Sequence, residues 1–135
     1  MNDSSFDFSF SGLKTALLYQ VQRDKNWKNK IPTYCAEFQQ AIIDVLVSKT
    51  TRAAKKYQVK SIMLAGGVAA NLELREQLGR AVTKELPPVK YNIPDLKYTT
   101  DNAAMIAAAG YFYFKNRKLK PWNKIRVDCN AGLTN

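Results

Sequence analysis

The fold is decided by the stretch Ile62-Met63-Leu64-Ala65-Gly66-Gly67-Val68-Ala69-Ala70-Asn71. A short apolar run over 61–65 ends at paired glycines, a pattern typical of a strand that is buried on both faces of a parallel sheet. Gly66 and Gly67 leave the main chain open to a phosphate or nucleoside, and the free N–H groups of a following helix favour an anion. The stretch therefore predicts an α/β fold with a turn that can face a ligand.

Asn71, at the start of the helix after this turn, has more than one interpretation. Its amide can cap the helix, or it can reach a ribose. The stretch matches neither the Walker A pattern nor G-x-G-x-x-G, so the usual phosphate-binding fingerprints are absent. An ordinary tight turn with an Asn cap explains the same residues, and both interpretations stay open at this point.

The rest of the chain shows helical patterns and short alternating runs. Apolar residues spaced three and four apart predict helices over 13–22, 32–57 and 71–86. Alternation predicts strands over 6–10 and 89–93, and small residues predict a buried helix over 102–110. Ser11-Gly12 is expected to end the first strand, and the polar stretch 23–30 is expected to be a loop.

The composition is that of a folded protein with one core. The chain has 135 residues, of which 46% are hydrophobic and 24% charged, so a single domain over 1–135 is expected. No apolar run is long enough to cross a membrane and the start resembles no export signal, which predicts a cytoplasmic protein without a membrane partner. Cys35 and Cys129 are therefore expected to be reduced.

Charge and the missing histidine limit the chemistry. The formal net charge of +10 makes a polyanionic partner plausible. The chain contains 0 histidines, which excludes His-based triads and His-ligated zinc built from this chain alone. Any metal here needs carboxylates or ligands from elsewhere.

Two regions near the C-terminus have alternative interpretations. Asp101 is read either as the N-cap of the helix that follows it or as a carboxylate beside a metal or phosphate. The tail over 112–126 carries basic and aromatic residues and no acid, which suits either nucleic-acid binding or a solvated helix end with core aromatics. Arg117, Lys118 and Lys120 are the candidate nucleic-acid contacts, and tRNA contacts if the nucleic acid is a tRNA.

Three motifs together resemble one known family. They are Phe8-Ser9-Phe10-Ser11-Gly12-Leu13-Lys14-Thr15, then Ala65-Gly66-Gly67-Val68-Ala69-Ala70-Asn71, then Thr100-Asp101-Asn102-Ala103-Ala104-Met105-Ile106-Ala107. In order and spacing they resemble the TsaD family, also known as glycoprotease or O-sialoglycoprotein endopeptidase. The resemblance covers nearly the whole chain but only the C-terminal portion of the family, with a bacterial character.

The resemblance implies a fold and an activity. The fold would be one lobe of an actin-like, sugar-kinase-like (ribonuclease H-like) ATPase, a mixed sheet flanked by helices, with the first lobe absent. The family transfers a threonylcarbamoyl group from threonylcarbamoyl-AMP to N6 of the adenosine next to the anticodon in tRNA; metallo-glycoprotease is an older assignment. The implied partners are tRNA, a TsaB-like paralogue and a TsaE-like ATPase.

The resemblance also implies roles for single residues. Asn71 would contact the adenylate of threonylcarbamoyl-AMP or an ATP-like ligand, with Gly66 and Gly67 forming the turn beside it. Asp101 would bind one divalent metal, iron or zinc. The family's other metal ligands are histidines of an H-x-x-x-H motif in the first lobe, so this chain alone is expected to be inactive. Ser9, Ser11 and Lys14 lie in a family-like motif and are interpreted as structural.

Two further classes of function remain as rivals. A stand-alone basic nucleic-acid-binding module without catalysis would explain the charge and the basic tail. A pure interaction domain would need neither adenylate nor nucleic acid. For the lobe, an exposed apolar face around Gly66, Gly67 and Met105 is expected to favour self-association.

Overall fold

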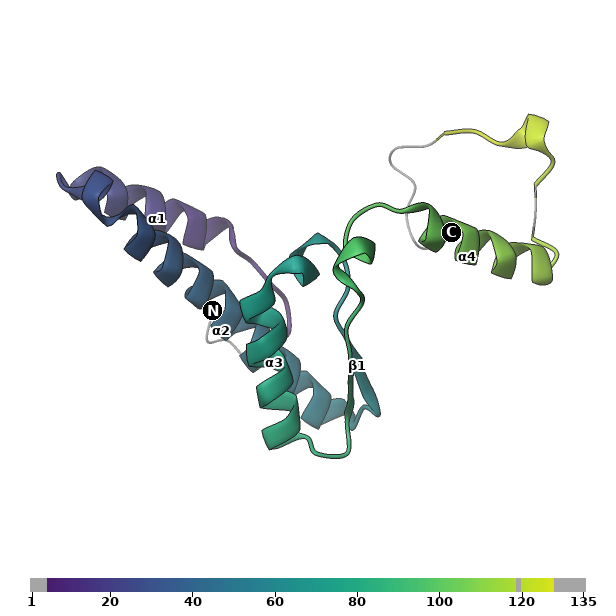
Figure 1. Ribbon diagram of the computed structural model, residues 1–135, viewed down its shortest axis with the longest axis horizontal. Coiled ribbons are helices and arrows are strands. Elements are labelled where there is room, and N and C mark those ends of the chain that lie inside the picture. The colour runs from purple at the N-terminus through teal and green to yellow at the C-terminus, as the bar shows by residue number, and fades with distance from the viewer. Residues whose placement is uncertain (1–4, 119, 128–135) are drawn as a thin grey trace. The chain divides into compact units, whose positions relative to one another are not determined.

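The computed structural model describes residues 5–118 and 120–127. The helices are α1 (Ser11–Arg23), α2 (Ile31–Tyr57), α3 (Leu72–Glu85) and α4 (Ala103–Lys115), and the strands are β1 (Ser61–Met63) and β2 (Lys90–Asn92) (Figure 1). Short 3-10 helices lie at Trp27–Lys30, Gly67–Ala70, Leu96–Tyr98 and Trp122–Lys124. The chain divides into two compact units between Thr99 and Thr100. That both belong to a single domain stays a prediction.

β1 and β2 lie within the strands predicted over 61–65 and 89–93, and the structure pairs them in parallel. Ser61 of β1 lies opposite Lys90 of β2, and Met63 lies opposite Asn92. A parallel pair needs a long crossover connection, which α3 provides. The expected mixed sheet is not seen, because the described residues form a sheet of two parallel strands.

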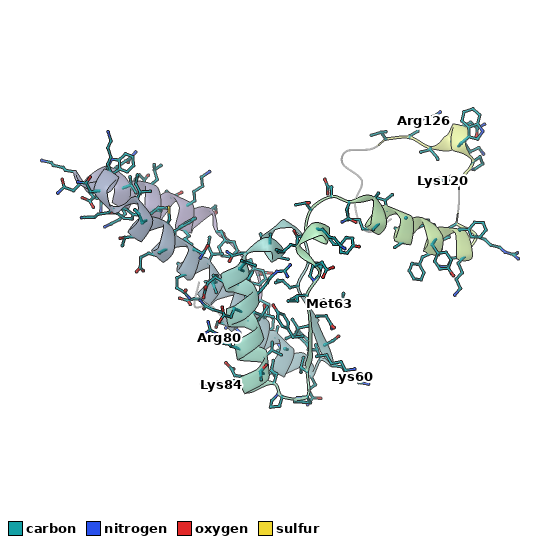
Figure 2. The ribbon with its side chains drawn as sticks, viewed as in Figure 1. Lys60, Met63, Arg80, Lys84, Lys120 and Arg126 are labelled. Carbon is teal, nitrogen blue, oxygen red and sulfur yellow. The ribbon has the colours of Figure 1, made fainter. Side chains whose placement is uncertain are left out.

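β1 is not buried on both faces, contrary to the prediction. Ile62 points into the core, whereas the Met63 side chain is 76% exposed (Figure 2). The reason is the small size of the sheet: α2 and α3 cover one face, and the described residues of this unit supply no second layer for the other. An apolar run before a turn cannot distinguish a covered face from an uncovered one.

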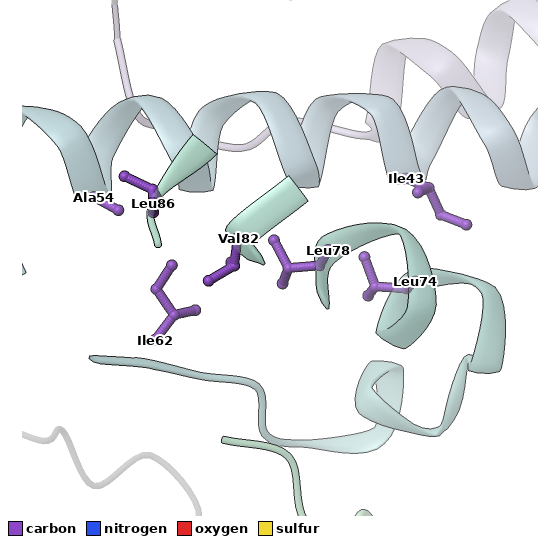
Figure 3. Close-up of a cluster of buried hydrophobic side chains, with 7 residues drawn as sticks. All are labelled: Ile43, Ala54, Ile62, Leu74, Leu78, Val82 and Leu86. Atoms are coloured by element: carbon purple, nitrogen blue, oxygen red, sulfur yellow. The ribbon is translucent and has the colours of Figure 1, made fainter. Parts of the chain in front are cut away.

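The core lies where α2, α3 and the sheet meet (Figure 3). Its buried side chains are Ile43, Ala54, Ile62, Leu74, Leu78, Val82 and Leu86. The three from α3 are spaced four residues apart, so they form one stripe on the helix surface. The helix predicted over 71–86 from apolar spacing is confirmed, and these residues are its buried side.

α2 begins and ends close to its predicted bounds. Pro32 lies in the first turn, where its missing N–H is not needed by the helix. The helix ends at Tyr57 and is capped by Gln58, whose left-handed φ of 50° turns the chain while its N–H donates to the carbonyl of Ala54. The turn allows the chain to return as β1.

The expected loop over 23–30 is partly helical and is held by one carboxylate. Asp24 accepts hydrogen bonds from Lys30 Nζ at 2.8 Å, from the main-chain N–H of Asn26 at 2.8 Å and from Tyr34 Oη at 2.9 Å. These bonds, with Lys30 the largest cause, lower the pKa of Asp24 to about 2. Asp24 therefore joins the end of α1 to the first turns of α2.

The predicted strand over 6–10 is wrong. Residues 5–10 have no regular structure, and Ser11-Gly12 begins α1 instead of ending a strand. The aromatic side chains find partners without a strand ladder: Phe6 packs against Tyr57 of α2 at a ring separation of 5.8 Å, and Phe8 stacks on Phe10 at 6.2 Å. Alternation here reflects this aromatic packing.

α4, in the second unit, differs from its prediction in burial. It was expected to be buried, yet it contains no buried side chain. The other helical element described in that unit is the single turn Trp122–Lys124, which is too short to cover α4.

Among the described residues, none of the helices combines the length and the hydropathy that a membrane span requires.

The α3 stripe gives a direct test of this core. Leu78, which is 2% exposed, changed to alanine should lower the free energy of unfolding by about 2–5 kcal/mol because it leaves a cavity. Leu72, on the same helix and 66% exposed, changed to alanine should alter it by no more than about 0.5 kcal/mol. Urea denaturation followed by circular dichroism measures both, and equal losses would contradict the packing described.

Candidate functional site

The turn after β1 is open toward solvent. Gly66 has a φ of 78°, a conformation that favours glycine, and the main-chain N–H of Ala69 closes the turn on the Gly66 carbonyl at 3.0 Å. A Cβ built on Gly66 or Gly67 would meet no atom within 4 Å. Both residues are exposed, so a ligand can approach the main chain here without displacing a side chain.

Asn71 caps α3, as one of its interpretations predicted. Its Oδ1 accepts a hydrogen bond from the main-chain N–H of Leu74 at 3.1 Å. Its Nδ2 donates to Oε1 of Gln39, on α2, at 3.4 Å. The cap is therefore confirmed, while contact with a ribose or adenylate stays a prediction.

The Arg75 side chain holds the turn against α3, a role that the sequence did not predict. Its Nε donates to the carbonyl of Ala69, which is fully buried, and its Nη2 is buried without a hydrogen-bond partner among the described residues. Its own carbonyl accepts from Tyr91 Oη at 3.2 Å, and burial raises the pKa of that tyrosine. An arginine within a helical pattern is normally expected to be solvated, so the spacing of apolar residues does not predict this role.

A pair of amides joins α2 to α3 beside the turn. Gln40 Nε2 donates to Gln77 Oε1 at 3.0 Å, and Gln77 Nε2 donates back to Gln40 Oε1 at 2.8 Å. The same nitrogens also reach Asp44 at 2.7 Å and Glu73 at 2.8 Å. This network fixes how far α3 is shifted along α2, and with it the position of Asn71.

Asp101 does not cap α4, so that interpretation is wrong. The cap is Asn102, whose Oδ1 accepts from the Met105 N–H at 2.9 Å and whose Nδ2 donates to the Thr100 carbonyl at 2.9 Å. Asp101 lies one residue before the cap and is exposed. Because Asp and Asn cap equally well, the sequence alone could not decide between the neighbours.

The residues over 5–118 and 120–127 do not by themselves fit a metal centre. The described part of the chain contains no group of three or more histidine, cysteine, aspartate or glutamate side chains that could hold an ion. Asp101 is a single exposed carboxylate, and several fixed ligands are needed for a stable site. It can supply one ligand and no more.

The candidate tRNA contacts belong to the second unit. Arg117, Lys118 and Lys120 are exposed, and Trp122 nearby is 86% exposed. Figure 2 labels Lys120 and Arg126 of this basic tail.

The state of the cysteines is not tested. Cys35 is a free, exposed thiol, whereas Cys129 lies outside the described residues, so their predicted reduced state stays a prediction.

Comparison with known proteins identifies the family. A family model described as "TsaD: tRNA N6-adenosine threonylcarbamoyltransferase" matches residues 1–108. The chain belongs to the TsaD family. The three motifs quoted from the sequence all fall within the matched region, with the last ending one residue before its limit.

Bacterial relatives of the TsaD family align with almost the whole chain. Proteins named tRNA N6-adenosine threonylcarbamoyltransferase are 47% identical in Listeria welshimeri and 46% identical in Geobacillus thermodenitrificans, in each case over 98% of this chain. One from Syntrophomonas wolfei is 46% identical over 90%. The chain spans about 38% of the length of the first two relatives.

Capping at α4 can be tested at two adjacent residues. Asn102→Ala should speed hydrogen exchange of the Met105 amide about fivefold, because removal of an N-cap costs about 1 kcal/mol. Asp101→Ala should leave that exchange nearly unchanged, since its carboxylate makes no cap. Exchange measured by NMR decides between them, and a stronger effect of Asp101→Ala would make Asp101 the cap.

Proposed function

We propose that this chain acts as the C-terminal lobe of a tRNA threonylcarbamoyltransferase with the actin-like ATPase fold. The observation that carries the proposal is 47% identity along nearly the whole chain to a protein named for that activity. The proposed reaction moves a threonylcarbamoyl group from threonylcarbamoyl-AMP to N6 of the adenosine next to the anticodon. With a length about 38% of such relatives, the chain alone is expected to be inactive.

The proposed adenylate contacts are Gly66, Gly67 and Asn71. Support comes from the open space above both glycines and from the exposed turn at the end of β1, the edge where ligands collect in open α/β sheets. Nδ2 of Asn71 carries a second hydrogen besides the one directed at Gln39, so it can donate to an acceptor on the ligand.

The proposed metal contact is Asp101. Support comes from the cap at Asn102, because the helix N–H groups do not consume the Asp101 carboxylate. The divalent ion, iron or zinc, would need its remaining ligands from a part of the protein that carries histidine, which this chain lacks. Asp101 would then supply one negative charge to the site.

The test of this assignment uses a chimera. The segment of the Listeria welshimeri protein that aligns with this chain is replaced by the chain, and the chimera carries Asp101→Asn or, as control, Asp95→Asn, an equal change at another exposed aspartate. Asp101→Asn should lower metal content and threonylcarbamoyl transfer by at least about tenfold, because the metal loses a charged ligand. The thermal unfolding temperature of the metal-stripped chimera should be the same with and without Asp101→Asn.

Two outcomes of the chimera experiment contradict the assignment. Retained metal and near-normal transfer in Asp101→Asn would reject Asp101 as a ligand. Equal losses in Asp95→Asn would assign the effect to charge alone. If the parent chimera is inactive, the substitutions are made instead in the Listeria protein, at the positions that align with Asp101 and Asp95.

We propose that the basic tail binds tRNA. Arg117, Lys118 and Lys120 are exposed, the segment over 112–126 contains no carboxylate, and Trp122 offers a face for stacking. The rival, a stand-alone nucleic-acid-binding module, uses the same residues but predicts no response to adenylate.

Charge reversal at Arg117, Lys118 and Lys120 tests the tail in the isolated chain. Binding of tRNA should weaken, and the slope of log affinity against log salt should fall by roughly 0.7–0.9 for each phosphate that the tail no longer neutralises. The control reverses Lys14, Lys25 and Lys28, which are exposed in the first unit and change the net charge equally. Equal weakening in both variants would assign binding to net charge instead of to the tail.

The remaining partners and the location are also proposals. A TsaB-like paralogue and a TsaE-like ATPase are proposed to assist the whole protein in the cytoplasm. Self-association through apolar surface also stays a prediction; Gly66 and Gly67 are exposed in the first unit, and Met105 is 47% exposed in the second.

A further inference from the structure

We propose that Gln39 positions Asn71 in the adenylate site. Gln39 belongs to α2, 32 residues before Asn71, and lies in none of the motifs that carry the family resemblance. Its Oε1 accepts the Asn71 Nδ2 hydrogen bond at 3.4 Å. The proposal rests on the proposed function of the turn and adds a second helix to the site.

The argument starts from the Asn71 amide, whose two ends have different partners. Because Oδ1 must face the Leu74 N–H to cap α3, the Nδ2 end points away from the helix. Gln39 takes one of its two hydrogens, which restricts rotation about the last side-chain bond. The second hydrogen on Asn71 Nδ2 is then held in one orientation, in which it can donate to an acceptor on a ligand.

The surroundings keep both partners in place. The Gln40–Gln77 amide pair, next to Gln39 on α2, fixes the register of α2 against α3. Arg75 holds the Ala69 carbonyl and so prevents the turn from moving relative to α3. These polar contacts between α2, α3 and the turn therefore hold the main chain at Gln39 and Asn71 in place.

Gln39 is suited to positioning more than to stability. It is exposed, so removing it leaves no cavity in the core. Its hydrogen bond with Asn71 is long, and hydrogen bonds of this kind commonly tighten when a ligand is bound. A glutamate at this position keeps the acceptor, whereas a methionine of similar length removes it.

The experiment titrates the ¹⁵N-labelled 135-residue chain with adenosine and follows the Asn71 side-chain amide by NMR. Adenosine is uncharged, so a glutamate at position 39 does not repel it. Gln39→Met should move the Asn71 amide signals of the free protein and raise the Kd for adenosine about 3- to 10-fold, as expected when one hydrogen bond is removed. Gln39→Glu should restore both values, and Gln22→Met, the same exchange on α1, should change neither.

The outcomes separate this inference from the proposed function. If adenosine binds saturably and Gln39→Met leaves its Kd unchanged, the positioning role is overturned while the adenylate site stands. The same holds if Gln39→Glu raises the Kd as much as Gln39→Met does. No response of Asn71 to millimolar adenosine in the unmodified chain rejects the adenylate role of the turn, and the positioning role with it. Thermal unfolding of Gln39→Met should match the unmodified chain, and a large decrease there would assign the effect to stability.

Discussion

The first unit depends on one seam, the contact of the α3 apolar stripe with α2. Parallel strands cannot be joined by a short turn, so β1 and β2 pair only because α3 carries the chain back between them. α3 in turn remains in place because Leu74, Leu78 and Val82 are almost fully buried in this core. By ordinary transfer values, burial of each such side chain contributes about 1.5–3 kcal/mol.

The ligand-facing turn is a consequence of the same seam. Once α3 lies on α2, the chain must connect the end of β1 to the start of α3 through residues 64–71, and it turns at Gly66 with a positive φ. Arg75 and Asn71 are both on or next to the first turn of α3, so the side chains that fasten the turn and cap the helix are placed by the same packing. Stability and the candidate site are therefore coupled.

Sequence reasoning succeeded where one periodic pattern meets one physical demand. The helix over 71–86, the bounds of α2 and the strands near 61–65 and 89–93 followed from spacing, alternation and the paired glycines. It failed where the deciding contact is distant in sequence or local choices are equivalent: Phe6 packs on α2 instead of in a strand, and Asn102 caps in place of Asp101. Gln39 and Arg75 gave no signal, because a polar residue on a helix is normally solvated.

The two units differ in how far the polar groups of their candidate site residues are already engaged in hydrogen bonds within the chain. In the first unit the Asn71 oxygen is taken by the α3 cap and one amide hydrogen by Gln39, which leaves a single donor. Such a group can orient a ligand but cannot accept a proton or stabilise more than one charge. In the second unit the Asp101 carboxylate is spared by the Asn102 cap, and the basic residues over 112–126 have no acidic residue among them. On this division, the proposed adenylate contacts come from the turn after β1, while the charges proposed for metal and tRNA phosphate come from the segment after Thr99.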